Sequence, residues 1–314
     1  MKIFISGSMA YDRIMNFPGK FEDHILPEKI HMLNVSFTVQ DLSEKYGGTA
    51  GNIAYSLALL GEKPLILATV GQDFDRYEQW LKKNNLSMEG IRRISDKFTA
   101  CAYITTDMSD NQITGFNLGA MQYPSQYSFK DISPGNSPGN SLGIIAPGSL
   151  EDMLSYSRFY KEKKIPYIFD PGQSIPILDI ENMKEMISGA MIFISNDYEI
   201  EMVKKSTNLS DTEILARCGA VITTLGEKGS IVHTKGKSTK IPALEVENTI
   251  DPTGAGDAFR SGLIKGLVMK KDYIEAARLG AICASFAVEH LGTQEHYFDE
   301  KIFNKRYTGL FGKI

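Results

Sequence analysis

The chain has 314 residues, of which 42% are apolar and 23% charged, and its formal net charge is −4. This balance is typical of a globular protein with enough apolar material for a sizeable core. Nucleic-acid binding is disfavoured, because phosphate backbones are bound by clustered Lys and Arg, and acidic residues outnumber basic ones here.

The cysteines and the apolar runs bear on the compartment. Cys101, Cys218 and Cys283 are odd in number and far apart, which fits neither a disulfide framework nor a paired metal site, so we expect reduced structural thiols. No apolar run reaches the ~18 residues that span a bilayer, and the run at the N-terminus is too short for a signal peptide. We therefore expect a cytoplasmic protein with no membrane partner.

Short aliphatic runs recur between amphipathic stretches, and each ends in Gly, Pro, Ser, Asn or Asp. Continuous apolar runs are typical of strands buried on both faces, and the stretches between them supply helical crossovers. The pattern predicts an α/β fold with a doubly wound, mostly parallel sheet flanked by helices, formed as one domain over residues 1–314. The expected strands lie at residues 2–6, 64–70, 142–148, 166–172, 191–196 and 220–226.

Two regions break this rhythm. Residues 11–40, with YDRIMNF and HMLNVSFTV, and residues 98–121, with FTACAYITTD and NQITGFNLG, are β-rich and lack helical crossovers. They predict four strands of a small separate sheet that serves as a lid over one edge of the core. The stretch SPGNSPGN at 133–140 predicts a solvated loop.

The stretch DPTGAGDAF at 251–259 combines a glycine-rich turn with the expected start of a helix. A helix N-terminus presents unpaired N–H groups, and Gly254 and Gly256 let an anion approach them closely. Asp257 would repel a phosphate, but it is suited to accept the proton of a hydroxyl that attacks one. The helix end would favour the ionised carboxylate by ~0.3–1 kcal/mol, which predicts a weak base. Alternatively, Asp257 merely caps the helix.

Four stretches together carry a family resemblance. DPTGAGDAF resembles the C-terminal signature of the ribokinase-like, or PfkB, family of small-molecule kinases, and YGGTAGNIAYSLALLG at 46–61 resembles its N-terminal glycine signature. Between them, ISNDYEIE at 194–201 is similar to the Asn-x-x-Glu element and TLGEKG at 224–229 to the nucleotide loop. The resemblance implies a ribokinase-like fold, transfer of the γ-phosphate of ATP and a need for Mg²⁺.

Within that family, residues 7–37 and 104–121 resemble the lid strands of bacterial adenosine kinases. This implies phosphorylation of the 5′-hydroxyl of adenosine to give AMP in purine salvage, with adenosine and ATP as the small-molecule partners of a monomer or homodimer. The alternatives are a sugar kinase acting on a pentose or hexose, a nucleoside kinase of broader specificity and a catalytically silent nucleoside-binding protein. A dinucleotide-dependent oxidoreductase and a P-loop enzyme are disfavoured, because neither glycine fingerprint occurs.

Carried over residue by residue, the resemblance makes Asp257 the catalytic base. It assigns the anion hole to Gly254, Ala255 and Gly256, the nucleotide contacts to Asn196, Thr224, Gly226 and Gly229, and the Mg²⁺ contact to Glu199. The acceptor contacts are Ser8, Asp12, Gly47, Gly48 and Asn52. Two neighbouring ribose hydroxyls can both donate to one carboxylate, which suits Asp12. Plainer alternatives are a surface glutamate for Glu199 and an ordinary turn for GEKG.

Some positions stay open. Met32, Leu33, Phe37, Phe116 and Met121 are apolar candidates for contact with a base, and all five are equally suited to the interior of the lid. Some relatives have a basic residue at the tip of the second lid hairpin, where this chain has Asp110, Asn111 and Gln112. The anion hole would then rely on the helix end and on Arg260, which alternatively lies along the helix surface. Asp251 and Thr253 resemble positions of an optional K⁺ site.

Overall fold

The computed structural model describes residues 1–109, 111–129 and 140–312, so the predicted loop at 133–140 and Asp110 lie outside the described residues except for Asn140. A nine-stranded sheet with the order β13-β12-β11-β10-β9-β8-β1-β4-β5 forms the centre. Its strands are β1 (Lys2–Ser6), β4 (Leu65–Val70), β5 (Ile91–Arg93), β8 (Ser141–Ile145), β9 (Tyr167–Phe169), β10 (Ile192–Asn196), β11 (Ala220–Thr224), β12 (Ser230–Thr234) and β13 (Lys237–Ile241).

The strands from β5 to β11 in this order pair in parallel, and β12 and β13 are antiparallel. The chain leaves β1 toward β4 on one side and returns to β8 on the other, so the winding direction reverses beside β1. The doubly wound, mostly parallel sheet is therefore confirmed. The short β5 and the polar hairpin of β12 and β13 were not among the expected strands.

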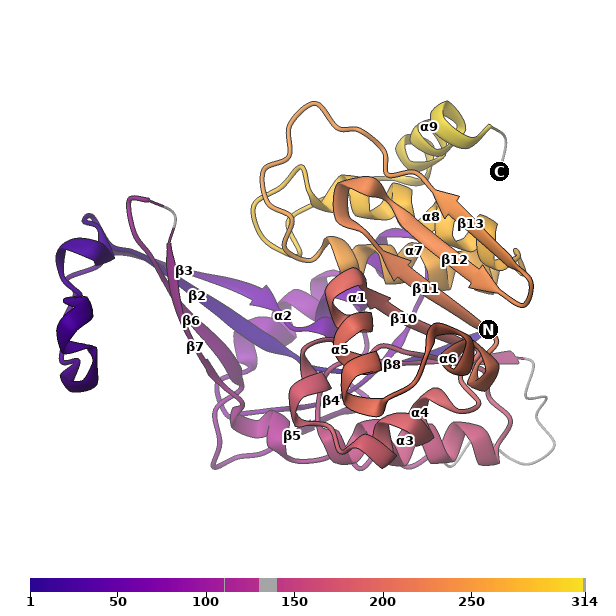
Figure 1. Cartoon of the computed structure of the whole chain (residues 1–314), viewed down its shortest axis with the longest axis horizontal. Helices are drawn as coiled ribbons and strands as arrows, with labels where there is room; N and C mark the ends of the chain where they lie inside the picture. The colour runs from indigo at the N-terminus through magenta and orange to yellow at the C-terminus, as the bar shows by residue number, and fades with distance from the viewer. Residues whose placement is uncertain (110, 130–139, 313–314) are drawn as a thin grey trace.

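Helices cover both faces of the sheet, as Figure 1 shows. Alternate residues of one strand point to opposite faces, so Ile3 and Ile5 pack beneath one helical layer and Phe4 beneath the other. The first layer consists of α1 (Thr49–Leu59), α2 (Asp75–Lys83), α7 (Ala255–Val268) and α8 (Tyr273–Ala287). The second consists of α3 (Leu150–Glu162), α4 (Ile180–Ile187), α5 (Asp197–Thr207) and α6 (Asp211–Arg217).

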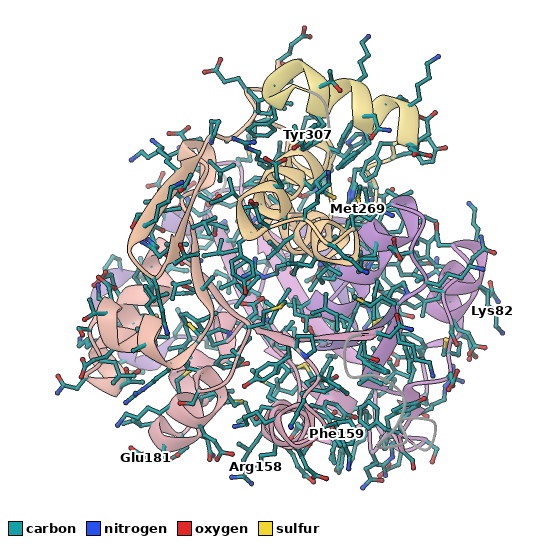
Figure 2. The ribbon with its side chains drawn as sticks, turned by 90° about the vertical axis from the view of Figure 1, so that its right-hand side faces the viewer. Lys82, Arg158, Phe159, Glu181, Met269 and Tyr307 are labelled. Carbon is teal, nitrogen blue, oxygen red and sulfur yellow. The ribbon has the colours of Figure 1, made fainter. Side chains whose placement is uncertain are left out.

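The last helix, α9 (Glu300–Phe311), packs on α8. Figure 2 shows Tyr307 on its inner side, where the hydroxyl donates to Glu275 at 2.6 Å. All three cysteines are unpaired and buried. Among the described residues, no helix has the length and apolar character needed to cross a membrane.

A separate four-stranded sheet extends from one side of the body (Figure 1). Its order is β3-β2-β6-β7, with β2 (Ala10–Asn16), β3 (Gln40–Gly47), β6 (Ala100–Thr106) and β7 (Gln112–Asn117). Short 3-10 helices are η1 (Phe21–Asp23), η2 (Pro27–Met32), η3 (Gly119–Gln122), η5 (Gly172–Ile177) and η6 (Gly226–Lys228).

One expected strand of this sheet was wrong. Residues 31–39 were predicted as a strand, but the strand begins at Gln40, which pairs with Asn16 at the end of β2. Pro18 follows that end, and proline has no N–H with which to continue a ladder. Residues 31–39 lie beyond the ladder without a partner strand, and Met32 and Leu33 are exposed.

Candidate active site

A cleft of about 1100 Å³ lies where the small sheet meets the carboxyl ends of the parallel strands. Open α/β sheets bind ligands at this edge, beside the strand where the winding reverses. Segments far apart in the sequence line the cleft: Ser8 after β1, Asp12 in β2, Thr224 at the end of β11 and the first turn of α7. The predicted acceptor, nucleotide and anion-hole segments therefore meet in one place.

The first turn of α7 forms one wall of the cleft. Gly254 is the N-cap at a φ of 80°, in the left-handed region that favours glycine. The N–H of Ala255 already donates to the carbonyl oxygen of Pro252 at 3.2 Å. The N–H groups of Gly256 and Asp257 have no hydrogen-bond acceptor among the described residues. Of the predicted anion hole, the N–H of Ala255 is therefore occupied and that of Gly256 is available, and the N–H of Asp257 is available in addition.

Asp257 lies inside this wall, half-buried. Its Oδ2 accepts from Nδ2 of Asn52 in α1 at 2.8 Å, so the carboxylate does more than cap its own helix. Burial raises the pKa of Asp257 to about 6, against the lowering effects of Arg260 and Asn52. The raised pKa makes Asp257 a stronger base than the helix end alone predicts, because burial disfavours the charged carboxylate.

Arg260 points into the protein and not along the helix surface. Its guanidinium donates to both oxygens of Asp170, at 2.9 Å from Nη2 to Oδ1, and Nη1 donates to the carbonyl oxygen of Gly256 at 2.9 Å. Arg260 is 6% exposed and Asp170 is 2% exposed, and both line the cleft. Sequence reasoning missed Asp170, although it lies within the expected strand at 166–172 and directly follows β9 at the ligand-binding edge.

On the acceptor side, Asp12 belongs to β2 of the small sheet. Burial raises its pKa to about 6, with a further contribution from Asp251, and its carboxylate has no hydrogen-bond donor among the described residues. A Cβ at Gly47 would lie 2.5 Å from Oδ2 of Asp12, so the glycine leaves room for this carboxylate. Gly48 lines the cleft as the N-cap of α1. The hydroxyl of Ser8 is already occupied at that helix start, where it accepts from the N–H of Thr49 at 3.0 Å.

On the nucleotide side, Asn196 and Glu199 hold each other at the start of α5. The N–H of Glu199 donates to Oδ1 of Asn196 at 2.7 Å, and the N–H of Asn196 donates to Oε2 of Glu199 at 2.8 Å, which is a capping box. Glu199 nevertheless lines the cleft and is not a surface residue; burial raises its pKa. Its other oxygen has no donor among the described residues.

Mg²⁺ keeps several waters and takes one or two protein carboxylates together with substrate phosphates. The free oxygen of Glu199 fits that need. No cluster of three or more His, Cys, Asp or Glu side chains suited to a metal ion occurs in the part of the chain that the structure describes. Both oxygens of Asp251 accept main-chain N–H groups, from Thr253 at 2.9 Å and Gly292 at 3.0 Å.

The remaining predicted residues differ in what they do. Thr224, Gly226 and Gly229 line the cleft, with positive φ at both glycines. Of the five apolar lid candidates, only Phe116 lines it. Phe37 packs against Phe17 and Phe21 within the small sheet's own cluster.

Comparison with known proteins identifies the fold. A model of the pfkB family of carbohydrate kinases matches residues 8–300. The chain belongs to this family. The nucleoside kinase of Methanocaldococcus jannaschii is 33% identical over 93% of this chain and 92% of its own length. Its crystal structure superposes with a TM-score of 0.84, covering 98% of this chain and 99% of that one.

A second similar protein is the nucleoside kinase of Burkholderia thailandensis. Its complex with inosine is 36% identical, has a TM-score of 0.83 and covers 99% of this chain and 98% of that one. Another structure of the same protein is a complex with ADP-inosine. These matches confirm the ribokinase-like fold. This pfkB-family kinase is an ATP-dependent phosphotransferase with an alcohol group as acceptor.

Proposed function

We propose that this kinase transfers the γ-phosphate of ATP to the 5′-hydroxyl of nucleosides and accepts several bases, adenosine among them. The observation that carries the proposal is that two carboxylates share one cleft. Asp12 has no hydrogen-bond donor in the part of the chain that the structure describes. Asp257 lies at a helix N-terminus, close enough for the charge on Asp12 to raise its pKa. The names of the similar proteins support a nucleoside over a free sugar.

The reaction follows from these positions. Asp12 accepts hydrogen bonds from the ribose hydroxyls and so fixes the nucleoside in the cleft. Asp257 takes the proton of the 5′-hydroxyl as its oxygen bonds to the γ-phosphorus, and the bond to the β,γ-bridging oxygen breaks to release ADP. The N–H groups of Gly256 and Asp257 receive the negative charge of the transferred group. When bound near Glu199, Mg²⁺ neutralises phosphate charge.

Phe116 suggests why base selection is broad. It is the apolar lid candidate that lines the cleft, and an aromatic face stacks on any base. Such stacking contributes ~1–3 kcal/mol per base, roughly 5- to 150-fold in kcat/KM. A free sugar would forgo this contribution, although Asp12 would serve its hydroxyls equally well.

A substrate panel tests this assignment. With ATP and Mg²⁺, we expect adenosine, inosine, guanosine and cytidine to exceed ribose and fructose in kcat/KM by at least ~5-fold. Phe116→Ala should narrow that difference, while Phe98→Ala, which removes an exposed ring that does not line the cleft, should not. Equal activity on ribose would favour the sugar-kinase alternative, and a preference for adenosine alone would restore the narrower assignment.

The pH dependence of kcat/KM should reflect the titration of two carboxylates, Asp12 and Asp257. Their pKa values are raised to about 6. Asp257 must be ionised to take a proton, and Asp12 must be ionised for both of its oxygens to accept from the ribose hydroxyls, so activity is present above that pH and lost below it. We expect kcat/KM to fall on the acid side with a limiting slope of about 2. Asp12→Asn should reduce the slope to about 1. An unchanged rate down to pH 4.5 would contradict both assignments.

A further inference from the structure

Gln294, which follows α8, connects the wall of the cleft to α2. It is 2% exposed. Its Oε1 accepts from the indole Nε1 of Trp80 at 2.9 Å, and its Nε2 donates to Oδ1 of Asn52 at 3.0 Å and to the hydroxyl of Tyr77. Because Asn52 donates to Asp257, a continuous chain of hydrogen bonds runs from Trp80 to the base.

The direction of every hydrogen bond in this chain is fixed at its outer end. An indole N–H can only donate, so the amide atom of Gln294 that faces Trp80 must be the oxygen. Its nitrogen then faces Asn52, so Asn52 presents its oxygen to Gln294 and its nitrogen to Asp257. With Gln294 held in this way, Asn52 cannot turn its amide without losing both hydrogen bonds.

From this geometry we infer that Trp80 and Gln294 are positioning residues, which keep Asn52 a permanent donor to Oδ2 of Asp257. The inference rests on the proposed role of Asp257 as base. Asn52 occupies one acceptor site of Oδ2, whereas Oδ1 has no donor among the described residues, so Oδ1 is the oxygen more open to the substrate proton. A fixed donor also favours the ionised carboxylate, because a hydrogen bond to a charged oxygen is stronger than one to a neutral carboxyl group.

Gly51 in α1 leaves space for this hydrogen-bond network. A Cβ at Gly51 would lie 2.1 Å from the hydroxyl oxygen of Tyr77 and 3.1 Å from Nε2 of Gln294. The hydroxyl of Tyr77 in turn donates to the carbonyl oxygen of Gly47 at 2.9 Å. A side chain at position 51 would therefore displace two members of the network at once.

Three other charged groups change the pKa of Asp257, and their effects partly cancel. Arg260 from its own helix lowers its pKa, while Asp170 after β9 and Asp12 from β2 raise it. None of these three is hydrogen-bonded to Trp80 or Gln294. Substitutions of Trp80 or Gln294 therefore leave these three charges in place. What such substitutions alter is the hydrogen bond from Asn52 to Asp257.

The test is the acid limb of kcat/KM in Gln294→Met, which removes both polar ends of the amide at similar volume. Freed from Gln294, Asn52 is able to turn and accept from protonated Asp257. We expect the apparent pKa to move up by roughly 1 unit, so that activity falls about tenfold at pH 5 and little at pH 8. Of the hydrogen bonds in the network, Trp80→Phe removes only the one from the indole to Gln294, so it should raise the apparent pKa of the acid limb in the same direction by a smaller amount.

Tyr55→Phe is the matched control. It removes another buried hydrogen bond, to the carbonyl oxygen of His296 at 2.7 Å, two residues from Gln294 and outside the chain. Its acid limb should overlie that of the unaltered protein. Trp80 is the single tryptophan of the chain, so loss of its hydrogen bond in Gln294→Met should also shift the fluorescence emission. An unshifted emission would show that the indole is not bonded to Gln294.

Failure of the inference and failure of the proposed function are distinguishable. If Asp257→Asn retains normal turnover, the base is misassigned. If Asp257→Asn is inactive but both Gln294→Met and Trp80→Phe keep the acid limb of the unaltered protein, the base stands and the positioning role is wrong. An equal shift in Tyr55→Phe would assign the effect to general loosening of this region and would likewise overturn the inference.

Discussion

Asp257→Asn should lower turnover by at least ~100-fold, the lower end for loss of a positioned general base. The amide is nearly the same size as the carboxylate, and the ribose is expected to be held by Asp12, so nucleoside affinity should be retained. The measurement is kcat under saturating ATP together with nucleoside binding by calorimetry. The hydrogen bond from Asn52 to Oδ2 at 2.8 Å can be kept, because the amide oxygen of the substituted residue still accepts.

Asp12→Asn provides the contrasting variant. Asp12 is assigned to binding and Asp257 to proton transfer, so Asp12→Asn should act mainly on KM and Asp257→Asn mainly on kcat. The two carboxylates have similarly raised pKa values, and a comparison of variants at one pH above 7 avoids confusion with their titration. Turnover in Asp257→Asn within a few-fold of normal would remove this residue from the mechanism.

Arg260→Met should destabilise the fold by ~3–5 kcal/mol, because it leaves Asp170 buried without its partner. The free energy of unfolding measured in denaturant gives this value directly. Replacing both partners, in Arg260→Met with Asp170→Leu, should recover most of the loss, since two apolar side chains of similar volume leave no buried charge. A double variant as unstable as the single one would contradict this account.

Arg158 supplies a control of the same chemistry at the surface. Figure 2 shows it at the outer side of α3, and its guanidinium contacts both oxygens of Glu185, at 2.7 and 2.8 Å. The side chains are 57% and 35% exposed. Because exposed ion pairs contribute about 0–1 kcal/mol, Arg158→Met should change the stability little. Equal free energies of unfolding for Arg158→Met and Arg260→Met would contradict the expectation that breaking the buried ion pair costs more than breaking the exposed one.

Much of the fold was predictable because buried parallel strands have an unmistakable composition. Runs such as KIFIS and MIFISN are aliphatic on both faces, so sequence alone places β1 and β10. The hairpin of β12 and β13 was not predicted, because its solvent-exposed positions are polar. The bounds of β3 were not predicted either, because they depend on pairing with β2 and not on local composition. The segment at 31–39 has the composition of a strand but no neighbour.

The candidate site was predictable where its residues fall in short motifs. Asp257, Asn196 and the glycines are found in this way, and they meet in the cleft. The contacts of Arg260 and Gln294 were not predictable, because their partners Asp170 and Asn52 lie 90 and 242 positions away. The raised pKa of Asp257 was missed for the same reason, since burial depends on distant segments that close around it.

The capping box gives Asn196 and Glu199 a structural role that does not depend on catalysis. One oxygen of Glu199 is committed to starting α5, and helix caps contribute ~0.5–2 kcal/mol. Selection for folding alone would thus preserve Asn-x-x-Glu in a descendant that had lost the reaction. The presence of Asn-x-x-Glu in another sequence is therefore weak evidence of activity. Retention of Asp257 is stronger evidence, because its half-buried carboxylate, with a raised pKa, is less stable ionised here than in water.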